Sequence, residues 1–411
     1  MPGRDIIVIG ASAGGVQALI ELVRGLPRDI PAAVFVAIHT SPASPSLLPQ
    51  ILQRAGSLAA SHAADRAKVR HGHIYVAPPD HHLLLHDGTI RVARGPKENG
   101  FRPAADPLFR TAARTCGPRT IGVVLSGGLD DGTEGLALIK KFGGVAVAQD
   151  PDDAPFPSMP ASAIANVEVD HVLPVAEMAA LLARLASEPI PQESLAMARN
   201  NGEEREGEQA RPDVAEVGDT SLLSGDLPGP PSGFTCPECG GALWELRSGT
   251  LLRFRCHVGH AYSAEGLVSE QTRDLESALW SALRALEENA ALRRRMARAR
   301  SGQYSIIAEE YEKQAIDAED RAAVIRGALI AKESADAAER TAPRRPRPQW
   351  DEQLYGKKST QTQRKGGNGA APGGGGAKGA VEAKPRRRKA NPESKGGRGE
   401  KAARSAGPAK A

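Results

Sequence analysis

Short apolar runs alternate with helical patterns through the first 186 residues. Residues 6–9, 33–38 and 120–125 are almost wholly apolar, which is typical of strands buried on both faces of a parallel sheet. The first run leads into apolar positions at helical spacing: Val16, Leu19, Ile20 and Val23. This alternation predicts an α/β fold built on a mostly parallel, doubly wound sheet over residues 1–187.

One segment departs from this alternation. Asp87-Gly88 separates two apolar runs within residues 83–92, which is a strong signal for a β-hairpin. We therefore expect one antiparallel hairpin beside the parallel sheet. Five histidines surround it with no standard metal-ligand spacing, and loops and solvated faces are expected for them: His71, His73, His81, His82 and His86.

Polar side chains follow the three buried runs where each strand is expected to end. Ser12 lies in a small-residue turn after the first run, His39 follows the second, and Asp130 and Asp131 lie in the loop after the third. Because the carboxyl ends of parallel strands share one edge of an open sheet, these side chains are expected to converge. Ser, His and one Asp of that loop suit a nucleophile, a general base and an acid that orients the imidazole.

The glycine-rich turn that contains Ser12 also has to be compared with two other known kinds of turn, the dinucleotide-binding fingerprint and the nucleophile elbow of α/β-hydrolases, and it fits both less well. Its glycines follow G-x-x-x-G-G and lack the first two glycines of the dinucleotide-binding fingerprint. His39 also stands where that fingerprint places an acidic residue. The segment 10–14 matches the nucleophile elbow G-x-S-x-G formally. However, the order here is Ser, His, Asp, whereas an α/β-hydrolase places its acid before its histidine.

Five segments of the domain form a recognisable series along the chain: Ile9–Gly15, Ile38-His39, Tyr75–Asp80, Leu125–Gly132 and Pro157–Ile164. Through these segments, in the same order, residues 5 to about 186 resemble the catalytic domain of CheB-type protein-glutamate methylesterases. By motif position, the resemblance implies Ser12 as nucleophile, His39 as base and Asp131 as acid. It implies no cofactor for catalysis.

The implied reaction is hydrolysis of glutamate γ-methyl esters on chemoreceptors, with deamidation of receptor glutamines, in chemotaxis-type signalling. The implied partners are a methylated chemoreceptor or other signalling protein and proteins of the methyltransferase and histidine-kinase pathways. The family often has Thr and Met where this chain has Ala13 and Gly128, and we expect backbone N–H groups at these positions to support the oxyanion. The competing interpretation is a catalytically weak regulatory or scaffold module that binds methylated signalling partners.

The architecture differs from that of the well-characterised members, which carry an N-terminal receiver domain. Here the nucleophile already falls at position 12 of 411, so we expect regulation to come from elsewhere. The sequence has no apolar run of about 18 residues and no signal peptide, and its four cysteines do not form a disulfide framework. These features favour a cytoplasmic protein.

The composition changes after the methylesterase-like domain. Residues 191–233 hold nine Asp or Glu against three Arg, and few large apolar side chains. This predicts a flexible acidic linker over residues 188–233.

A compact cysteine pattern follows in residues 234–264. Cys236 and Cys239 form a C-x₂-C-G knuckle, and Cys256 and His260 follow as C-x₃-H, which predicts a zinc ribbon. Three thiolates and one imidazole would complete a closed, structural zinc site, with a redox dithiol and a catalytic zinc as the less favoured alternatives. Adjacent residues in a tight knuckle point apart, so His257 is not expected to be a ligand. We expect catalysis at Ser12 to be independent of this module.

The remaining chain is expected to be helical and then disordered. Residues 265–340 carry narrow apolar stripes at helical spacing, which fit a helical hairpin packed on itself or paired with another chain. Residues 341–411 hold 18 Lys or Arg against 5 Asp or Glu, a net charge of +13, while residues 1–340 carry −9. This Gly- and Pro-rich basic tail is expected to be disordered and to bind polyanions nonspecifically.

Overall fold

The computed structural model describes residues 3–42, 46–202, 213–217, 229–248, 251–300 and 305–341, with side chains in the last range described for 306–331. The chain divides into two units, residues 1–340 and residues 341–411. The predicted basic tail, 341–411, falls in the second unit and, apart from Thr341, lies outside the described residues.

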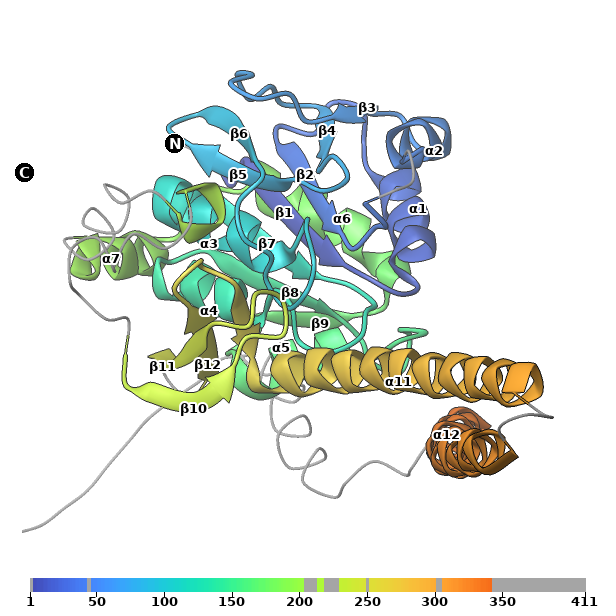
Figure 1. Ribbon diagram of the computed structural model, residues 1–411. Coiled ribbons are helices and arrows are strands. Elements are labelled where there is room, and N and C mark those ends of the chain that lie inside the picture. Colours follow the sequence, from blue (N-terminus) through green and yellow to red (C-terminus); the bar gives the residue numbers. More distant parts are fainter. Residues whose placement is uncertain are drawn as a thin grey trace, which may run out of the picture. The chain divides into compact units, whose positions relative to one another are not determined.

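A seven-stranded sheet forms the centre of the first unit (Figure 1). Every pairing within it is parallel. Its strands, from edge to edge, are β3 (Ala59–His62), β4 (His73–Val76), β2 (Ala33–Ile38), β1 (Ile6–Ala11), β7 (Thr120–Val124), β8 (Val145–Gln149) and β9 (His171–Leu173). The central strands β1, β2, β7 and β8 are buried along their whole length, as their apolar runs predict.

Helices cover both faces of this sheet. One apolar core joins it to α1 (Gly15–Gly25), α2 (Leu48–Ala55) and α6 (Val175–Ser187). The other core joins it to α3 (Ala105–Cys116), which continues into a short 3-10 turn at Gly117–Arg119, and to α4 (Thr133–Lys141) and α5 (Ser158–Asn166). The predicted doubly wound α/β fold is therefore confirmed.

The predicted hairpin is also present. Strands β5 (His82–His86) and β6 (Thr89–Ala93) pair antiparallel in a separate two-stranded sheet. Asp87 and Gly88 between them both have positive φ, 43° and 74°, which matches the backbone of a tight hairpin turn.

Two helices lie inside the range expected to be an acidic linker. They are α7 (Gln192–Asn200) and the short α9 (Val214–Val217). Asp213, just before α9, is buried and accepts hydrogen bonds from Arg110 and Arg114 of α3. Residues 203–212 and 218–228 lie outside the described residues, so the linker as a whole stays a prediction, but these two helices were not expected.

The cysteine-rich segment forms a four-stranded antiparallel sheet, here called the ribbon. Its strands are β10 (Pro231–Thr235), β11 (Ala242–Ser248), β12 (Leu251–Cys256) and β13 (Ala261–Ser263). A small apolar core that includes Leu243, Phe254 and Tyr262 lies beside the cysteines.

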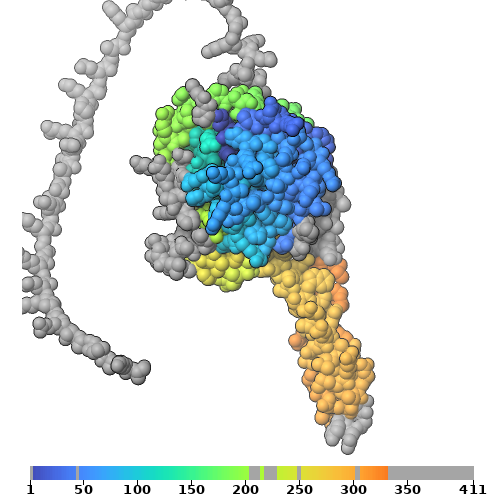
Figure 2. Space-filling view, turned by 90° about the horizontal axis from the view of Figure 1, so that it is seen from above, coloured from blue at the N-terminus to red at the C-terminus, as the bar shows by residue number. Residues whose placement is uncertain are grey.

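Two long helices follow the ribbon, α11 (Ala264–Arg300) and α12 (Ser305–Thr341). They pack on each other through Leu283, Ala322 and Leu329 and, further along, through Ala290 and Ala315, so the predicted helical hairpin is present. In the space-filling view the distal part of α11, drawn in orange, stands clear of the blue and green residues (Figure 2). Among the described helices, none is long and apolar enough to cross a membrane.

Candidate active site

Ser12 lies in the turn between β1 and α1. Its backbone N–H donates to Ser126 O at 3.0 Å, and its carbonyl accepts from Gly15 N at 2.9 Å. Gly14 has φ 75°, a left-handed conformation that favours glycine. The turn therefore presents the Ser12 hydroxyl at the carboxyl edge of the sheet, beside the start of a helix.

The structure brings Ser12, His39 and Asp131 together. His39 follows β2, and its Nδ1 lies 3.0 Å from Ser12 Oγ. Its Nε2 lies 2.8 Å from Asp131 Oδ2. Because a carboxylate only accepts hydrogen bonds, Nε2 carries the proton and Nδ1 is left to accept the Ser12 hydroxyl. This is the placement that the shared strand edge predicts.

Asp131 is held by the first turn of α3 as well as by His39. Ala105 N donates to Asp131 Oδ2 at 2.6 Å, and Asp106 N donates to Oδ1 at 3.2 Å. Burial alone would raise the pKa of Asp131, but the hydrogen bonds from His39, Ala105 and Asp106 outweigh it and lower that pKa. The carboxylate therefore stays ionised beside the imidazole.

The neighbouring Asp130 faces away from His39. Its Oδ1 accepts a hydrogen bond from Ser263 Oγ of the ribbon at 2.7 Å. Burial raises the pKa of Asp130 to about 6, although the Ser263 hydroxyl opposes the shift. Of the two acidic residues in this loop, Asp131 is thus the one that can orient the histidine.

Ala13 and Gly128, the two positions expected to support an oxyanion, lie at the site's rim. Ala13 is exposed and Gly128 is half-buried. Within the described part of the chain, neither backbone N–H has a hydrogen-bond partner, so both remain available as donors. The Ser126 hydroxyl holds the backbone beside these donors, a role that the sequence did not indicate. It donates to Ala13 O at 2.8 Å and accepts from Phe156 N at 3.0 Å.

Gly127 packs directly against the nucleophile. A Cβ at this position would lie 2.9 Å from Ser12 Cβ and would also collide with Met159. Hydrogen bonds fix its backbone on both sides, from Gly127 N to Phe156 O and from Met159 N to Gly127 O. The loop can approach Ser12 this closely only because residue 127 has no side chain.

We predict that Gly127→Ala lowers kcat by about 100-fold, because the new methyl group displaces Ser12 from His39. The measurement is turnover of an ester substrate under saturating conditions. Gly202→Ala is the matched control, since a Cβ there meets nothing within 4 Å. Equal activity of the two variants would contradict the prediction.

A loop over residues 95–104 covers the histidine, and the sequence did not reveal this. The Phe101 ring stacks on His39 with 3.8 Å between centroids and an interplanar angle of 3°. His82 is fully buried, not solvated as expected, and its Nε2 donates to Pro96 O at 2.9 Å. In the same loop, Arg102 Nε donates to Asp80 Oδ1 at 2.9 Å.

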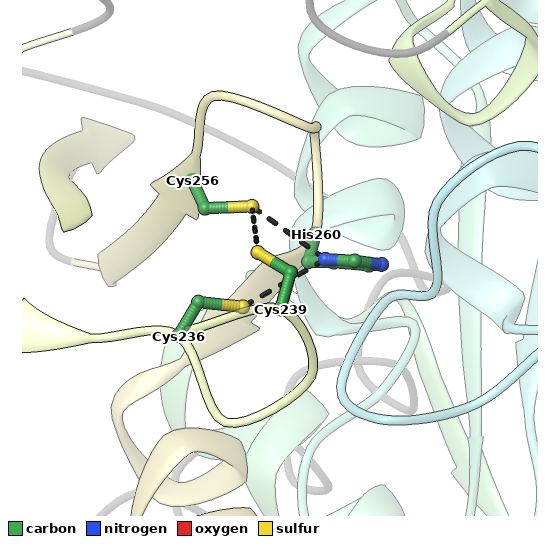
Figure 3. Close-up of side chains that lie close together, drawn as sticks. All are labelled: Cys236, Cys239, Cys256 and His260. Atoms are coloured by element: carbon green, nitrogen blue, oxygen red, sulfur yellow. Dashed lines mark hydrogen bonds between the residues drawn. The ribbon is translucent and has the colours of Figure 1, made fainter. Parts of the chain in front are cut away.

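Cys236, Cys239, Cys256 and His260 form the second candidate site, in the ribbon (Figure 3). The two knuckle cysteines follow β10, Cys256 ends β12, and all four side chains point toward one another. His260 Nδ1 lies 3.7 Å from Cys236 Sγ and 3.6 Å from Cys256 Sγ, and Cys239 Sγ lies 3.6 Å from Cys256 Sγ.

These separations fit a metal ion. Zinc–sulfur bonds of about 2.3 Å in a tetrahedron give sulfur–sulfur edges of about 3.8 Å. His257 lies outside this cluster, exposed, with its ring 6.5 Å from that of Trp244. The cluster can therefore hold a structural metal with four protein ligands, which leaves no position for a substrate.

Comparisons with known proteins agree with this arrangement. The family model of the CheB methylesterase matches residues 7–182. A Leptospira interrogans protein, named as a candidate protein-glutamate methylesterase/protein-glutamine glutaminase, is 36% identical over 189 residues, which cover 46% of this chain and 98% of the relative. An Anaeromyxobacter dehalogenans protein-glutamate methylesterase/protein-glutamine glutaminase is 39% identical over 181 residues, 44% of this chain and 53% of the relative.

A solved structure is also similar to part of the chain. The crystal structure of the Thermotoga maritima CheB methylesterase catalytic domain matches at 33% identity, covering 45% of this chain and all of that one, with a TM-score of 0.43. The ribbon, α11 and α12 lie beyond the residues that the family model matches. On the match to the family model and to nearly the full length of the Leptospira protein, the chain belongs to the CheB methylesterase family.

Proposed function

We propose that this protein hydrolyses glutamate γ-methyl esters, and deamidates glutamines, on chemoreceptor-like signalling proteins in the cytoplasm. The observation that carries the proposal is the continuous chain of contacts from Ser12 Oγ through His39 to Asp131. Membership of the CheB family supports the choice of substrate. Ser12 acts as nucleophile, His39 as general base and Asp131 as the acid that orients the imidazole.

The reaction begins with transfer of the Ser12 hydroxyl proton to His39 Nδ1. The oxygen then bonds to the ester carbonyl carbon, and negative charge develops on the carbonyl oxygen. Asp131 stabilises the imidazolium that forms, and the N–H groups of Ala13 and Gly128 donate to the oxyanion. No metal or cofactor is required for these steps.

The second half of the reaction uses the same groups in reverse. His39 Nδ1–H gives its proton to the departing methoxide, which leaves as methanol, or to the departing amine of a glutamine, which leaves as ammonia. A water molecule then transfers a proton to His39 and attacks the glutamyl-Ser12 ester. Cleavage of the ester restores the Ser12 hydroxyl and releases a glutamate carboxylate.

Methanol release from a methylated receptor fragment tests this proposal against the scaffold interpretation. A functional esterase is expected to release many equivalents of methanol per chain, with first-order dependence on protein concentration. A module that only binds methylated partners would retain the fragment and release none. Ammonia release from the corresponding glutamine-containing fragment tests deamidation in the same way.

We further propose that the ribbon cluster holds one zinc ion. Three cysteine thiolates and one histidine form a ligand set that zinc prefers. Among its described residues, the ribbon's small apolar core contains few large side chains, including Leu243, Phe254 and Tyr262, so a bound metal would supply much of its folding free energy. A structural role fits four protein ligands better than a catalytic one.

Deletion of residues 341–411 tests the role proposed for the basic tail, which is nonspecific binding of polyanions. The deletion removes a charge of +13 and should abolish salt-sensitive retention on a polyanion matrix. Turnover of a small soluble ester should stay unchanged, because the triad and the residues described in contact with it all precede residue 341. Retention of the truncated protein at the same salt concentration as the full chain would contradict this prediction.

A further inference from the structure

The ribbon packs against the catalytic domain on the side of Asp131. Ser263 N donates to Asn99 Oδ1 at 2.8 Å, and Asn99 N donates to Ala261 O at 2.8 Å. Together with the hydrogen bond from Ser263 Oγ to Asp130, these contacts join the last ribbon strand, β13, to two loops beside the triad. Figure 1 shows β12 near α4, and the ion pair between Arg253 and Glu134 joins these two elements.

Arg253 of β12 lies at the centre of this contact. Its side chain is only 5% exposed and forms ion pairs with Asp106 Oδ2 at 2.9 Å, Glu134 Oε2 at 2.6 Å and Glu98 Oε2 at 3.4 Å. All three carboxylates belong to the catalytic domain. Their oxygens lie close enough together to suggest a metal site, but the guanidinium of Arg253 already contacts each of them and serves as their countercharge.

The catalytic domain does not balance this buried charge by itself. Arg110 of α3 contacts Glu98 and Glu134 and is also shared with the buried Asp213. Asp106, which Arg110 does not contact in any described ion pair, has Arg253 as its cationic partner. A buried carboxylate that loses its cationic partner is strongly destabilising. The charge of Arg253 is therefore needed where the ribbon meets α3.

Asp106 connects Arg253 to the triad. Its Oδ1 accepts from Gly135 N of α4 at 2.8 Å while Oδ2 accepts from Arg253. Its backbone N–H and that of Ala105 are the two groups that hold Asp131. Burial raises the pKa of Asp106 to about 8, against the attraction of Arg253 and with further upward shifts from Asp131, Glu134 and Glu98. The hydrogen bonds to both of its carboxyl oxygens hold Asp106, and with it the start of α3, in place.

A second route leads from Arg253 to His39. Glu98, which accepts from Arg253 and Arg110, begins the segment that carries Phe101, the ring stacked on His39. The first turns of α11 pack against the same segment. Glu270 lies against Gly100, and the guanidinium of Arg273 lies 6.0 Å from the Phe101 ring centroid. The ribbon and the first turns of α11 therefore contact the residues that support both His39 and Asp131.

We propose that Arg253 is a positioning residue for the triad. Through Asp106 it fixes the backbone N–H groups that hold Asp131, and through Glu98 it fixes the loop that covers His39. The folded ribbon thereby becomes a part of the esterase and sets its turnover number. This inference rests on the proposed function, and it replaces the expectation from sequence that catalysis is independent of the ribbon.

The test compares Arg253→Met and Arg253→Lys with Arg247→Met and Arg247→Lys in the full chain. Arg247 lies on β11 of the same ribbon, its side chain is 80% exposed, and its ion pair is with Glu245 within the ribbon. We expect Arg253→Met to lower kcat by about 10- to 100-fold with little change in KM, because the triad is misaligned while substrate contacts remain. Arg253→Lys should recover part of kcat, since it keeps the charge but not the forked geometry.

A double-mutant comparison separates positioning of the triad from a general loss of structure. In a His39→Ala background, Arg253→Lys and Arg253→Met should each lower the residual kcat by less than about 3-fold, because both routes from Arg253 act through the imidazole, which is already absent. Equal kcat for the Arg253 and Arg247 variants would overturn the inference, and so would a full loss in the His39→Ala background. If Arg253→Met fails to fold, the comparison of Arg253→Lys with Arg247→Lys decides alone. Absence of methanol release from the unmodified protein would instead reject the proposed function.

Discussion

Ser12→Ala and His39→Ala are each expected to lower kcat for methanol release by about 10⁴- to 10⁶-fold, and the double variant should lose little more. The reason is that the hydroxyl and the imidazole act as one unit, joined by the 3.0 Å contact from Ser12 Oγ to Nδ1. Once either group is absent, the other has no proton to transfer or accept. The measurement is methanol released per chain from a methylated receptor fragment, with folding checked by circular dichroism.

Ser187→Ala provides the matched control for this series. Ser187 is exposed at the end of α6, and its hydroxyl donates to Ala183 O, far from the sheet edge that carries the site. Its kcat should equal that of the unmodified protein. If the two losses from Ser12→Ala and His39→Ala multiplied in the double variant, the two residues would be acting independently, and the proposed mechanism would be wrong.

The positions of the three triad residues follow from sequence because Ser12 and His39 come directly after buried strands and Asp131 lies in the loop that follows a third. Strands β1, β2 and β7 are neighbours in the sheet, in the order β2-β1-β7. Side chains at their carboxyl ends therefore meet, although 92 residues separate His39 from Asp131. The choice between Asp130 and Asp131 needed the family motif, since both follow the same strand and only tertiary contacts send one of them to Ser263.

The supports of the triad could not be read from the sequence in the same way. Phe101 lies between the hairpin and α3, in a stretch with no periodic pattern, and the N–H groups of Ala105 and Asp106 belong to the first turn of α3. Backbone donors carry no residue-type signal at all. A lone aromatic residue in a polar loop has many roles, and only the geometry of the 3.8 Å stack assigns this one to His39.

Arg253 shows a different limit of sequence analysis. In β12, Arg253 is followed by the apolar Phe254, and successive side chains of a strand point to opposite faces. This pattern predicts that Arg253 lies on the solvent face of the strand. The three carboxylates that bury it lie 119 to 155 residues earlier in the chain. Similarly, the helices α7 and α9 lie in an acidic stretch whose composition favours a linker, and the buried pair Asp213–Arg110 depends on a partner in α3.

Substitution of the fourth ribbon ligand is expected to have the largest effect on stability. His260→Ala should lower the zinc content well below one ion per chain and unfold the ribbon, because zinc binding of about 10–16 kcal/mol provides most of the folding free energy of such modules. His257→Ala should retain one zinc per chain, since that ring is exposed beside Trp244 and outside the cluster. The measurements are zinc per chain and amide hydrogen exchange of β11 and β12 in the full-length protein.

His260 is assigned as the fourth ligand because its Nδ1 faces both Cys236 and Cys256. Equal loss of zinc from the two histidine variants, or loss from His257→Ala alone, would show that this assignment is wrong. If Arg253 positions the triad as proposed, His260→Ala should also lower kcat, whereas His257→Ala should leave it unchanged.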